Sequence, residues 1–166
     1  MGADDEASTI DQAALRAVMG HFATGVTVIT AMHDGMPLGI AANSFTSVSL
    51  DPPLVLFCAG KSSSTWPGIK ASGAFAVNIL AEEQEPVSRL FSSKDADRFA
   101  GVGHRVAATG SPILDGALAF LDCRIESEHD AGDHVIVVGR VVELSVQRDG
   151  PPLVFFRGGY HCLGRG

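Results

Sequence analysis

Short runs of apolar and β-branched residues, separated by glycine, proline and polar residues, recur along the chain. Runs of this kind predict strands, and alternation of apolar with polar positions predicts that one face of a strand is buried. Asp34-Gly35 and Ala131-Gly132-Asp133 predict the turns of two hairpins. The expected strands cover residues 26–30, 36–42, 45–50, 54–58, 75–79, 118–128, 134–146 and 153–156.

The run at 54–58 is apolar at every position, which predicts a central strand buried on both faces. Three other segments are expected to be helical. A Thr-x-x-Gln capping-box pattern at residues 9–12 precedes a helix expected over residues 11–21, where apolar residues recur at helical spacing. Residues 62–72 begin with hydroxyl residues and a proline, and residues 82–91 begin with glutamates that suit the positive end of a helix dipole.

These elements predict a mainly β protein with a few helices. Antiparallel strands of this number hide their edges well in a closed or partly closed barrel. We expect residues 1–10 to form a flexible tail and residues 11–166 a single domain, with a long polar loop over 92–112. The strands at 118–128 and 134–146 carry more apolar surface than one small barrel buries, which predicts a homodimer.

The composition narrows the classes of function. Of the 166 residues, 46% are hydrophobic and 19% are charged, as expected of a folded domain. A net charge of −7 argues against nucleic-acid binding. No apolar stretch is long enough for a membrane helix, and the amino-terminus lacks the pattern of a signal peptide, so we expect a cytoplasmic protein.

The three cysteines lack the spacing of a zinc site or of a disulfide framework, and no metal is expected. Cys123 lies within an apolar alternation and is expected to be a core residue. The chain also has no Ser-His-Asp motif of the G-x-S-x-G type, no H-E-x-x-H and no G-x-G-x-x-G.

Two polar segments near the ends of predicted strands are candidates for ligand binding. Five of the nine side chains at residues 41–49 carry hydrogen-bonding groups, which fits an exposed strand edge or a surface that binds a flat heteroaromatic ring. Residues 58–66 combine Gly60 and Lys61 with several hydroxyls before a predicted helix. They lack the first glycine of a P-loop, so they indicate either a phosphate-binding helix start or a capped helix with one exposed lysine.

Three further segments carry weaker indications. Lys94 and Arg98 are cations in an acidic chain, suited either to a phosphate or to a solvated loop. His134 follows a Gly-Asp pair at a predicted turn, where a histidine is more often structural than catalytic. Tyr160, the only tyrosine, follows two glycines that permit a close approach to a ligand, and its alternative role is to close the barrel.

Taken in order over about residues 13–164, these segments resemble the short-chain flavin reductases, the reductase components of two-component flavin-dependent monooxygenases. The stretch Ala42–Leu54 is the most specific part of the resemblance, and Gly132–His134 is specific through its position. The other matching stretches are His21–Thr30, Phe75–Leu80, Phe91–Phe99 and Arg157–Tyr160.

The resemblance implies a split β-barrel of the FMN-binding type, a homodimer with FMN or FAD between the barrel and the partner subunit. It also implies hydride transfer from NADH or NADPH to flavin N5, after which the reduced flavin leaves for a partner monooxygenase. The nicotinamide would lie beside His134, and Lys94 would reach the flavin phosphate. The other implied flavin contacts are Asn43, Ser44, Phe45, Thr46 and Ser47 along the ring and ribityl chain, Cys58, Ala59, Ser62, Ser63, Ser64 and Thr65 along the tail, and Tyr160.

Hydride transfer between two cofactors needs no side-chain acid or base, which agrees with the lack of a conventional catalytic set. Two alternatives stay open. One is a flavoprotein that keeps its FMN for electron transfer, and the other is a split-barrel oxidase of the pyridoxamine-phosphate type. The sequence leaves the choice between FMN and FAD, and between NADH and NADPH, undecided.

Overall fold

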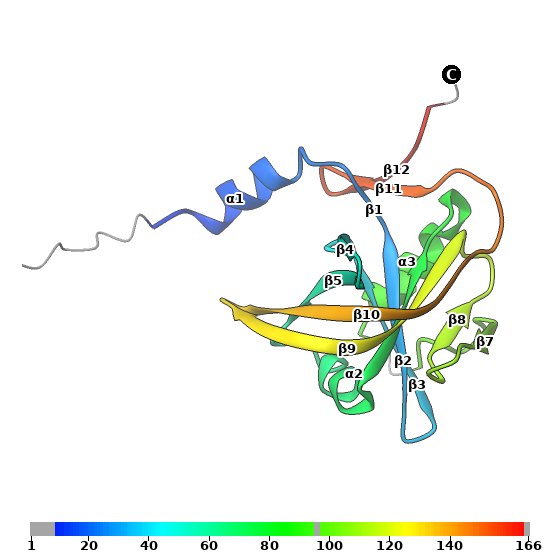
Figure 1. The fold of residues 1–166 in the computed structure, drawn as a ribbon. Helices are drawn as coiled ribbons and strands as arrows, with labels where there is room; N and C mark the ends of the chain where they lie inside the picture. The colour runs from blue at the N-terminus through cyan, green and yellow to red at the C-terminus, as the bar shows by residue number, and fades with distance from the viewer. Residues whose placement is uncertain (1–8, 95–96, 165–166) are drawn as a thin grey trace, which may run out of the picture.

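Strands are the main regular structure in the computed structural model, which describes residues 9–94 and 97–164 (Figure 1). The predicted mainly β fold with a few helices is therefore confirmed, while residues 1–8 of the expected tail lie outside the described part.

The helices are α1 (Gln12–Met19), α2 (Trp66–Ser72) and α3 (Glu85–Ser92), and a 3₁₀ turn, η1 (Glu82–Gln84), precedes α3. The strands are β1 (Thr24–Gly25), β2 (Thr27–His33), β3 (Met36–Ala42), β4 (Thr46–Leu50), β5 (Pro53–Gly60), β6 (Ala74–Ile79), β7 (His104–Val106), β8 (Pro112–Leu114), β9 (Ala119–Ala131), β10 (His134–Val146), β11 (Leu153–Phe156) and β12 (Gly159–Cys162).

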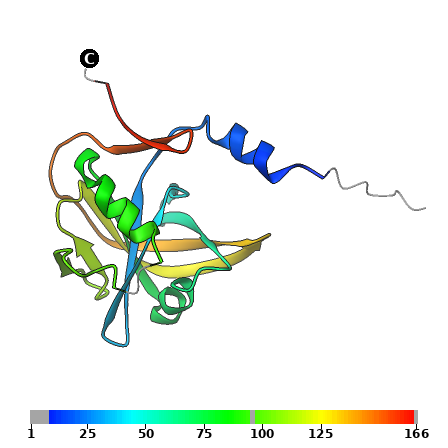
Figure 2. The same cartoon turned by 180° about the vertical axis from the view of Figure 1, so that it is seen from behind.

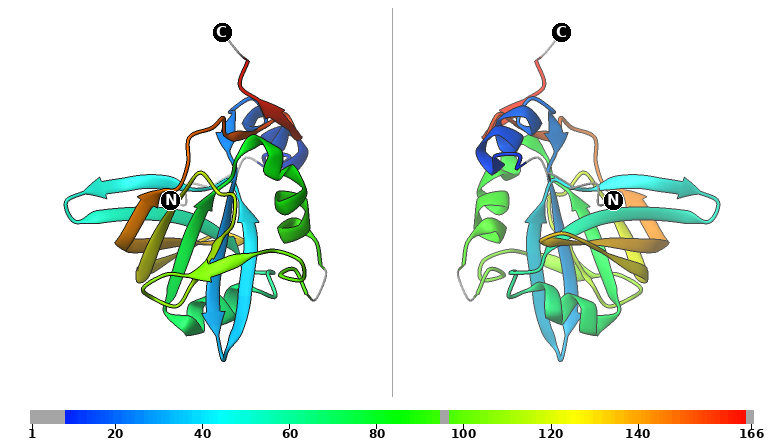
Figure 3. Two further views of the ribbon diagram at one scale, coloured as in Figure 1. Left: turned by 90° about the vertical axis from the view of Figure 1, so that its right-hand side faces the viewer. Right: turned by 90° about the vertical axis from the view of Figure 1, so that its left-hand side faces the viewer.

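A seven-stranded sheet in the order β3-β2-β6-β9-β10-β5-β4 forms the body of the molecule. Its two edge strands, β3 and β4, are joined by residues 43–45 alone. In a flat sheet, six spacings of about 4.8 Å would separate these edges by roughly 29 Å. The chain from Ala42 to Thr46 reaches at most about 14 Å. The sheet therefore curls until its edges approach each other at this connection, which produces a split barrel (Figure 3).

Smaller elements cover the ends of the barrel. Strands β1, β11 and β12 form a separate three-stranded sheet, and α3 packs on β3 (Figure 2). The β7–β8 hairpin begins within the predicted loop and ends two residues beyond it. Side chains tie it to the barrel: the Thr30 hydroxyl donates to the Pro112 carbonyl at 2.6 Å, and buried Asp122 accepts from the Thr109 hydroxyl at 2.6 Å. Burial raises the pKa of Asp122, and the bonds from Thr109 oppose that rise.

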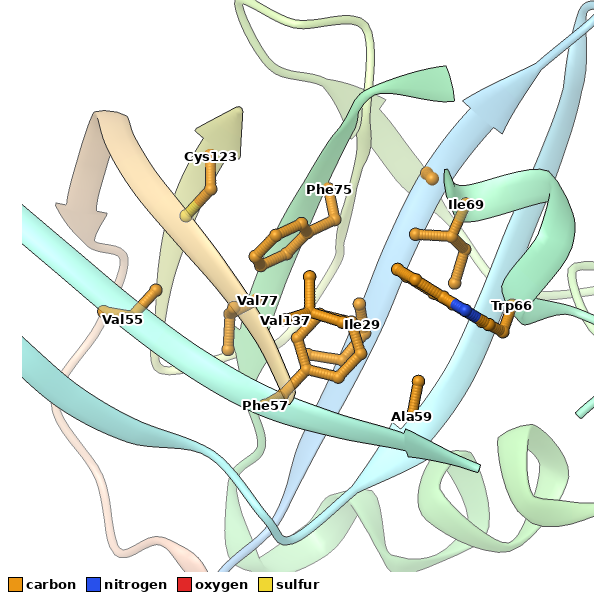
Figure 4. Packing of buried hydrophobic residues seen from close by; sticks show 11 residues of the cluster. Ile29, Val55, Phe57, Ala59, Trp66, Ile69, Phe75, Val77, Cys123 and Val137 are labelled. Atoms are coloured by element: carbon orange, nitrogen blue, oxygen red, sulfur yellow. The ribbon is translucent and has the colours of Figure 1, made fainter. Parts of the chain in front are cut away.

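The core lies inside the barrel, where aromatic rings from three elements meet (Figure 4). Phe57 from β5 packs edge-on against Phe75 from β6 at 4.9 Å and against Trp66 from α2 at 6.1 Å, measured between ring centroids. Cys123 is fully buried in this cluster, as the sequence predicted. Burial raises the pKa of its thiol to about 12, so Cys123 stays protonated and acts as an apolar residue.

Several predicted elements are confirmed residue by residue. Strands β3, β10 and β11 have the predicted bounds. Asp34 and Gly35 have φ values of 50° and 74°, the left-handed pair that a two-residue hairpin of type I′ requires. The sequence analysis missed β1, the β7–β8 hairpin and β12, which are short and begin or end beside glycine or proline.

Three expectations are wrong. Asp11, whose carboxylate accepts from the Ala13 amide at 3.0 Å, caps α1 in place of the predicted capping box from Thr9. The strand at 54–58 is not buried on both faces, because only the inner face of a curled sheet reaches the core, and Leu56 on the outer face stays partly exposed. Helix α2 begins at Trp66, so residues 62–65 form the turn before it.

Among the described residues, no helix is long and apolar enough to cross a membrane.

Gly139 in β10 provides a test of the core. A Cβ at this position would lie 2.9 Å from Cε1 of Phe75 and 3.0 Å from Cβ of Cys123, so Gly139→Ala should force these residues apart. Overpacking of this kind typically lowers the free energy of unfolding by about 1–3 kcal/mol. Urea denaturation measures the change, and Gly25→Ala is the control, because a Cβ at Gly25 has nothing within 4 Å. Equal stability of the two variants would contradict this packing.

Candidate functional site

A groove of about 760 Å³ lies where the end of β3 faces the end of β5, and we call it the split groove. The carboxyl end of α3 and the first residue of β10 complete its walls. Its volume is in the range of sites that bind small molecules and cofactors. The residues that the sequence analysis selected and that line it are Asn43, Ser44, Cys58, Ser62, Ser63, Ser64, Lys94 and His134.

The connection between the two edge strands is fixed on β5 by one hydroxyl. Ser44 Oγ accepts from the Cys58 amide at 3.0 Å and donates to the Cys58 carbonyl at 3.3 Å. The hydroxyl of Ser44 is therefore bonded to the protein backbone. The neighbouring Asn43 is exposed, makes no hydrogen bond within the described residues and lines the split groove and both other cavities described below.

The serines before α2 divide into two kinds. Ser63 Oγ accepts from the amides of Thr65 and Trp66, each at 3.2 Å, and therefore caps the helix. Within the described chain, the side chains of Ser62 and Ser64 make no hydrogen bond, and both residues are exposed to the groove. These two hydroxyls are available to a ligand, whereas the Ser63 hydroxyl is largely used by the fold.

Two cations line the groove. Arg98, which the sequence analysis weighed but did not assign, donates from Nη1 to the carbonyls of Gly39 at 2.8 Å and Phe91 at 3.3 Å. Lys94 is exposed and pairs with no acidic side chain in the described part of the chain. Arg98 therefore holds the loop after α3 against β3, and Lys94 is the cation that is available to an anionic ligand.

His134 stands at the start of β10, opposite Gly60 in β5 and Ala131 in β9. Its Nδ1 lies 2.7 Å from Oδ1 of Asp133, and Nε2 would be 3.8 Å from a Cβ built on Gly60. The hydrogen bond and charge of His134 lower the pKa of Asp133, and the charge of Arg16 makes a smaller contribution in the same direction. The carboxylate thus orients an imidazole that forms part of the groove wall.

The structure places the other predicted residues elsewhere. Phe45 and Thr46 line a second cavity of about 880 Å³. Tyr160 lines a third, of about 290 Å³, where its hydroxyl lies 2.8 Å from Ser88 Oγ. The three that line none of these cavities are Ser47 on β4, Thr65 before α2 and Ala59, whose side chain is buried in the core.

Several groove residues were not assigned as ligand contacts from the sequence, although Gly60, Ala41 and Ala42 lie within its candidate segments. They are Gly60, Phe91 and the end of β3 at Ile40–Ala42, together with Ser92 and Ser93. Their pattern is that of ordinary strand and helix residues, and they line a cavity only because the sheet curls. Among the described residues, no group of three or more His, Cys, Asp and Glu side chains is placed to bind a metal.

Comparison with known sequences agrees with this geometry. The family model described as "Flavin reductase like domain" matches residues 19–164. The reductase subunit HsaB of a flavin-dependent monooxygenase from Rhodococcus jostii is 51% identical over 154 residues, which are 93% of this chain and 79% of that protein.

Solved structures share both the fold and the sequence pattern. Nitrilotriacetate monooxygenase component B from Mycobacterium thermoresistibile is 51% identical, with a TM-score of 0.90 over 93% of this chain and 87% of that one. The NADH:FAD oxidoreductase SgcE6 from Streptomyces globisporus, solved with NAD and FAD fragments, is 38% identical, with a TM-score of 0.88 over 93% of each chain. By its split barrel, by the polar groove along the split and by these matches, the chain belongs to the flavin reductase-like family.

Proposed function

We propose that this protein is an NAD(P)H-dependent flavin reductase that supplies reduced FMN or FAD to a partner monooxygenase. The observation that carries the proposal is the split groove. Around one space large enough for a cofactor it gathers an oriented histidine with hydroxyls and a lysine that have no side-chain partner among the residues described. The relatives named as reductase subunits of monooxygenases support the same function.

The donors that line the groove fit a flavin nucleotide. A phosphate requires hydrogen-bond donors and positive charge, and Ser62, Ser64 and Lys94 offer both. The edge of an isoalloxazine ring requires donors and acceptors, and the unbonded amide of Asn43 offers both. We therefore place the flavin in the split groove, with the hydroxyls and Lys94 at its phosphate.

Flavin, when bound, provides the hydride acceptor, so the contribution of the protein is position and charge. The two bonds from Ser44 to Cys58 hold the connection that contains Asn43 against β5, which keeps this part of the groove wall in place. Asp133 orients the ring of His134, which we assign to positioning the nicotinamide. Lys94 adds positive charge at the flavin phosphate. None of these roles is that of a general acid or base.

An assay of NAD(P)H oxidation with and without added flavin tests the function. The purified protein should need added FMN or FAD and should reduce many equivalents of it, with NADH or NADPH as the donor. A yellow protein that gains little from added flavin would instead be an electron-transfer flavoprotein. A protein that oxidises pyridoxamine phosphate and leaves NAD(P)H untouched would be an oxidase of the same fold. Running all four pairs of flavin and nicotinamide identifies the preferred cofactors.

Replacement of His134 tests its role at the nicotinamide. His134→Ala should raise KM for NAD(P)H or lower kcat by roughly tenfold to a hundredfold, because a lost positioning contact costs about 1–3 kcal/mol. Flavin affinity, measured by fluorescence quenching, should stay the same. The control is His129→Ala, an exposed histidine on β9 that bonds to Ser127. Equal kinetics of the two variants would make His134 a turn residue only.

The unbonded hydroxyls give a second test. FMN should bind more tightly than riboflavin, which has no phosphate, and the double change Ser62→Ala with Ser64→Ala should reduce this difference. Thermal stability should stay the same, since these side chains make no hydrogen bond in the described structure. Ser63→Ala is the matched control, because loss of its two cap bonds should cost about 1 kcal/mol of stability. Equal binding of riboflavin and FMN to the wild type would place the phosphate in solvent.

We also propose a homodimer. The outer face of β10 carries exposed apolar side chains, with Val142, Leu144 and Val146 at 46%, 64% and 72% relative exposure. Apolar rows of this length commonly mark an interface between subunits. Light scattering at micromolar protein should give about twice the 17.3 kDa of the chain. A monomeric particle that still reduces flavin would refute the dimer and leave the activity intact.

A further inference from the structure

Gly60 is the last residue of β5 and pairs with His134, the first residue of β10. Side chains at directly opposite positions of paired strands lie on the same face of the sheet. Here that face is the wall of the split groove, since Gly60 and His134 both line it. Ala59, the preceding residue on β5, is buried in the core. Residue 60 is therefore the position beside the imidazole where the groove wall has no side chain.

The fold does not require a glycine at this position. The φ of Gly60 lies outside the left-handed region that favours glycine. A Cβ built on Gly60 would lie 3.8 Å from Nε2 of His134, which is ordinary contact, and would have no other described atom within 4 Å beyond its chain neighbours. Gly139 differs, because a Cβ there would collide with the ring of Phe75. A glycine that weakens its strand without such a reason often marks a place where a ligand approaches closely.

The imidazole of His134 offers a hydrogen-bond acceptor beside this gap. Its Nδ1 lies 2.7 Å from Oδ1 of Asp133, and Nε2 has no hydrogen-bond partner within the described chain. The interaction with His134 lowers the pKa of Asp133, so the carboxylate is ionised near neutral pH and can only accept. Neutral His134 therefore carries its proton on Nδ1 and presents the lone pair of Nε2 to the groove. A ligand that fills the gap should bring an N–H donor.

The nicotinamide ring, which the proposed function places beside His134, carries such a donor. Its carboxamide is a planar primary amide whose NH₂ group can donate to Nε2. The carboxamide is bonded to the ring carbon next to C4, the carbon that donates the hydride, so holding this group also fixes the orientation of C4. We propose that Gly60 is a specificity-determining residue, because the absence of a side chain admits the carboxamide to His134. The inference rests on the proposed reductase function.

The variant Gly60→Ala tests the proposal, because its methyl group would occupy the gap. The value of kcat/KM for NAD(P)H should fall about tenfold, as expected for one lost hydrogen bond. The melting temperature should stay the same or rise, since the Cβ has space and alanine suits a strand better than glycine. A purely structural role of Gly60 predicts no such loss of activity in a protein of equal or higher stability.

Gly159→Ala is the matched control. Gly159 also stands at one end of a strand, β12, and its φ lies outside the left-handed region. A Cβ there would lie 3.5 Å from Nε2 of another histidine, His161. Gly159 lines none of the three cavities, so this variant should keep wild-type kinetics.

An analogue of the substrate identifies the group that enters the gap. The 3-acetylpyridine analogue of NAD(P)H carries an acetyl group in place of the carboxamide and has no N–H to donate. The ratio of kcat/KM for NAD(P)H to that for the analogue should fall about tenfold in Gly60→Ala and in His134→Ala. The two changes together should lower the ratio no further, because they remove the same hydrogen bond. Any intrinsic difference between the two hydride donors cancels when the variants are compared.

Wild-type kcat/KM for NAD(P)H in Gly60→Ala, or an unchanged ratio for the analogue, would overturn the inference. So would a raised Kd for FMN with an unchanged KM for NAD(P)H, since the gap would then receive the N3–H group of the flavin, the other amide donor in the reaction. If the wild type failed to oxidise NAD(P)H with added flavin, the proposed function itself would fall, whereas the other outcomes leave it in place.

Discussion

The three-residue connection between β3 and β4 is the constraint on which the rest of the molecule depends. It joins the two edges of a seven-stranded sheet and is too short to do so unless the sheet curls. The curl encloses the core and leaves one open line, the split. Ser44 keeps that line in place through its two bonds to Cys58, and all three cavities include Asn43. The fold and the site are therefore consequences of the same short segment.

Identical residue types have different roles along this line. The hydroxyls of Ser44 and Ser63 bond to backbone groups and hold the scaffold, while those of Ser62 and Ser64 stay unbonded in the described structure. Cations divide in the same way, because Arg98 bonds to carbonyls of the fold, whereas Lys94 has no such bond within the part of the chain that the structure describes. A binding surface thus consists of the polar groups that remain after the scaffold has satisfied its own requirements.

The sequence predicted most of the strands because alternation and turn residues are local properties. The left-handed pair Asp34-Gly35 and the bounds of β10 are examples. It could not predict that the apolar row of α1 stays exposed, because helical spacing does not say what the helix packs against. It assigned Thr46 and Tyr160 to the same site as Ser62, although the structure separates them into three cavities, since chain order carries no distances.

The register of the β9–β10 hairpin has a consequence for how this fold changes during evolution. His134 is the first residue of β10, and the register of this strand places it opposite Gly60. Two bulges, at Val138/Gly139 and Val141/Glu143, lie further along the same strand. Side chains in a strand alternate between its faces, so one residue inserted or deleted between the tip and the nearer bulge turns the imidazole to the opposite face. A homologue with every one of these residues but a hairpin longer by one would keep the motif and lose the imidazole from the wall of the split groove. Hairpin length, which no residue-by-residue motif records, is thus itself a condition for placing this side chain.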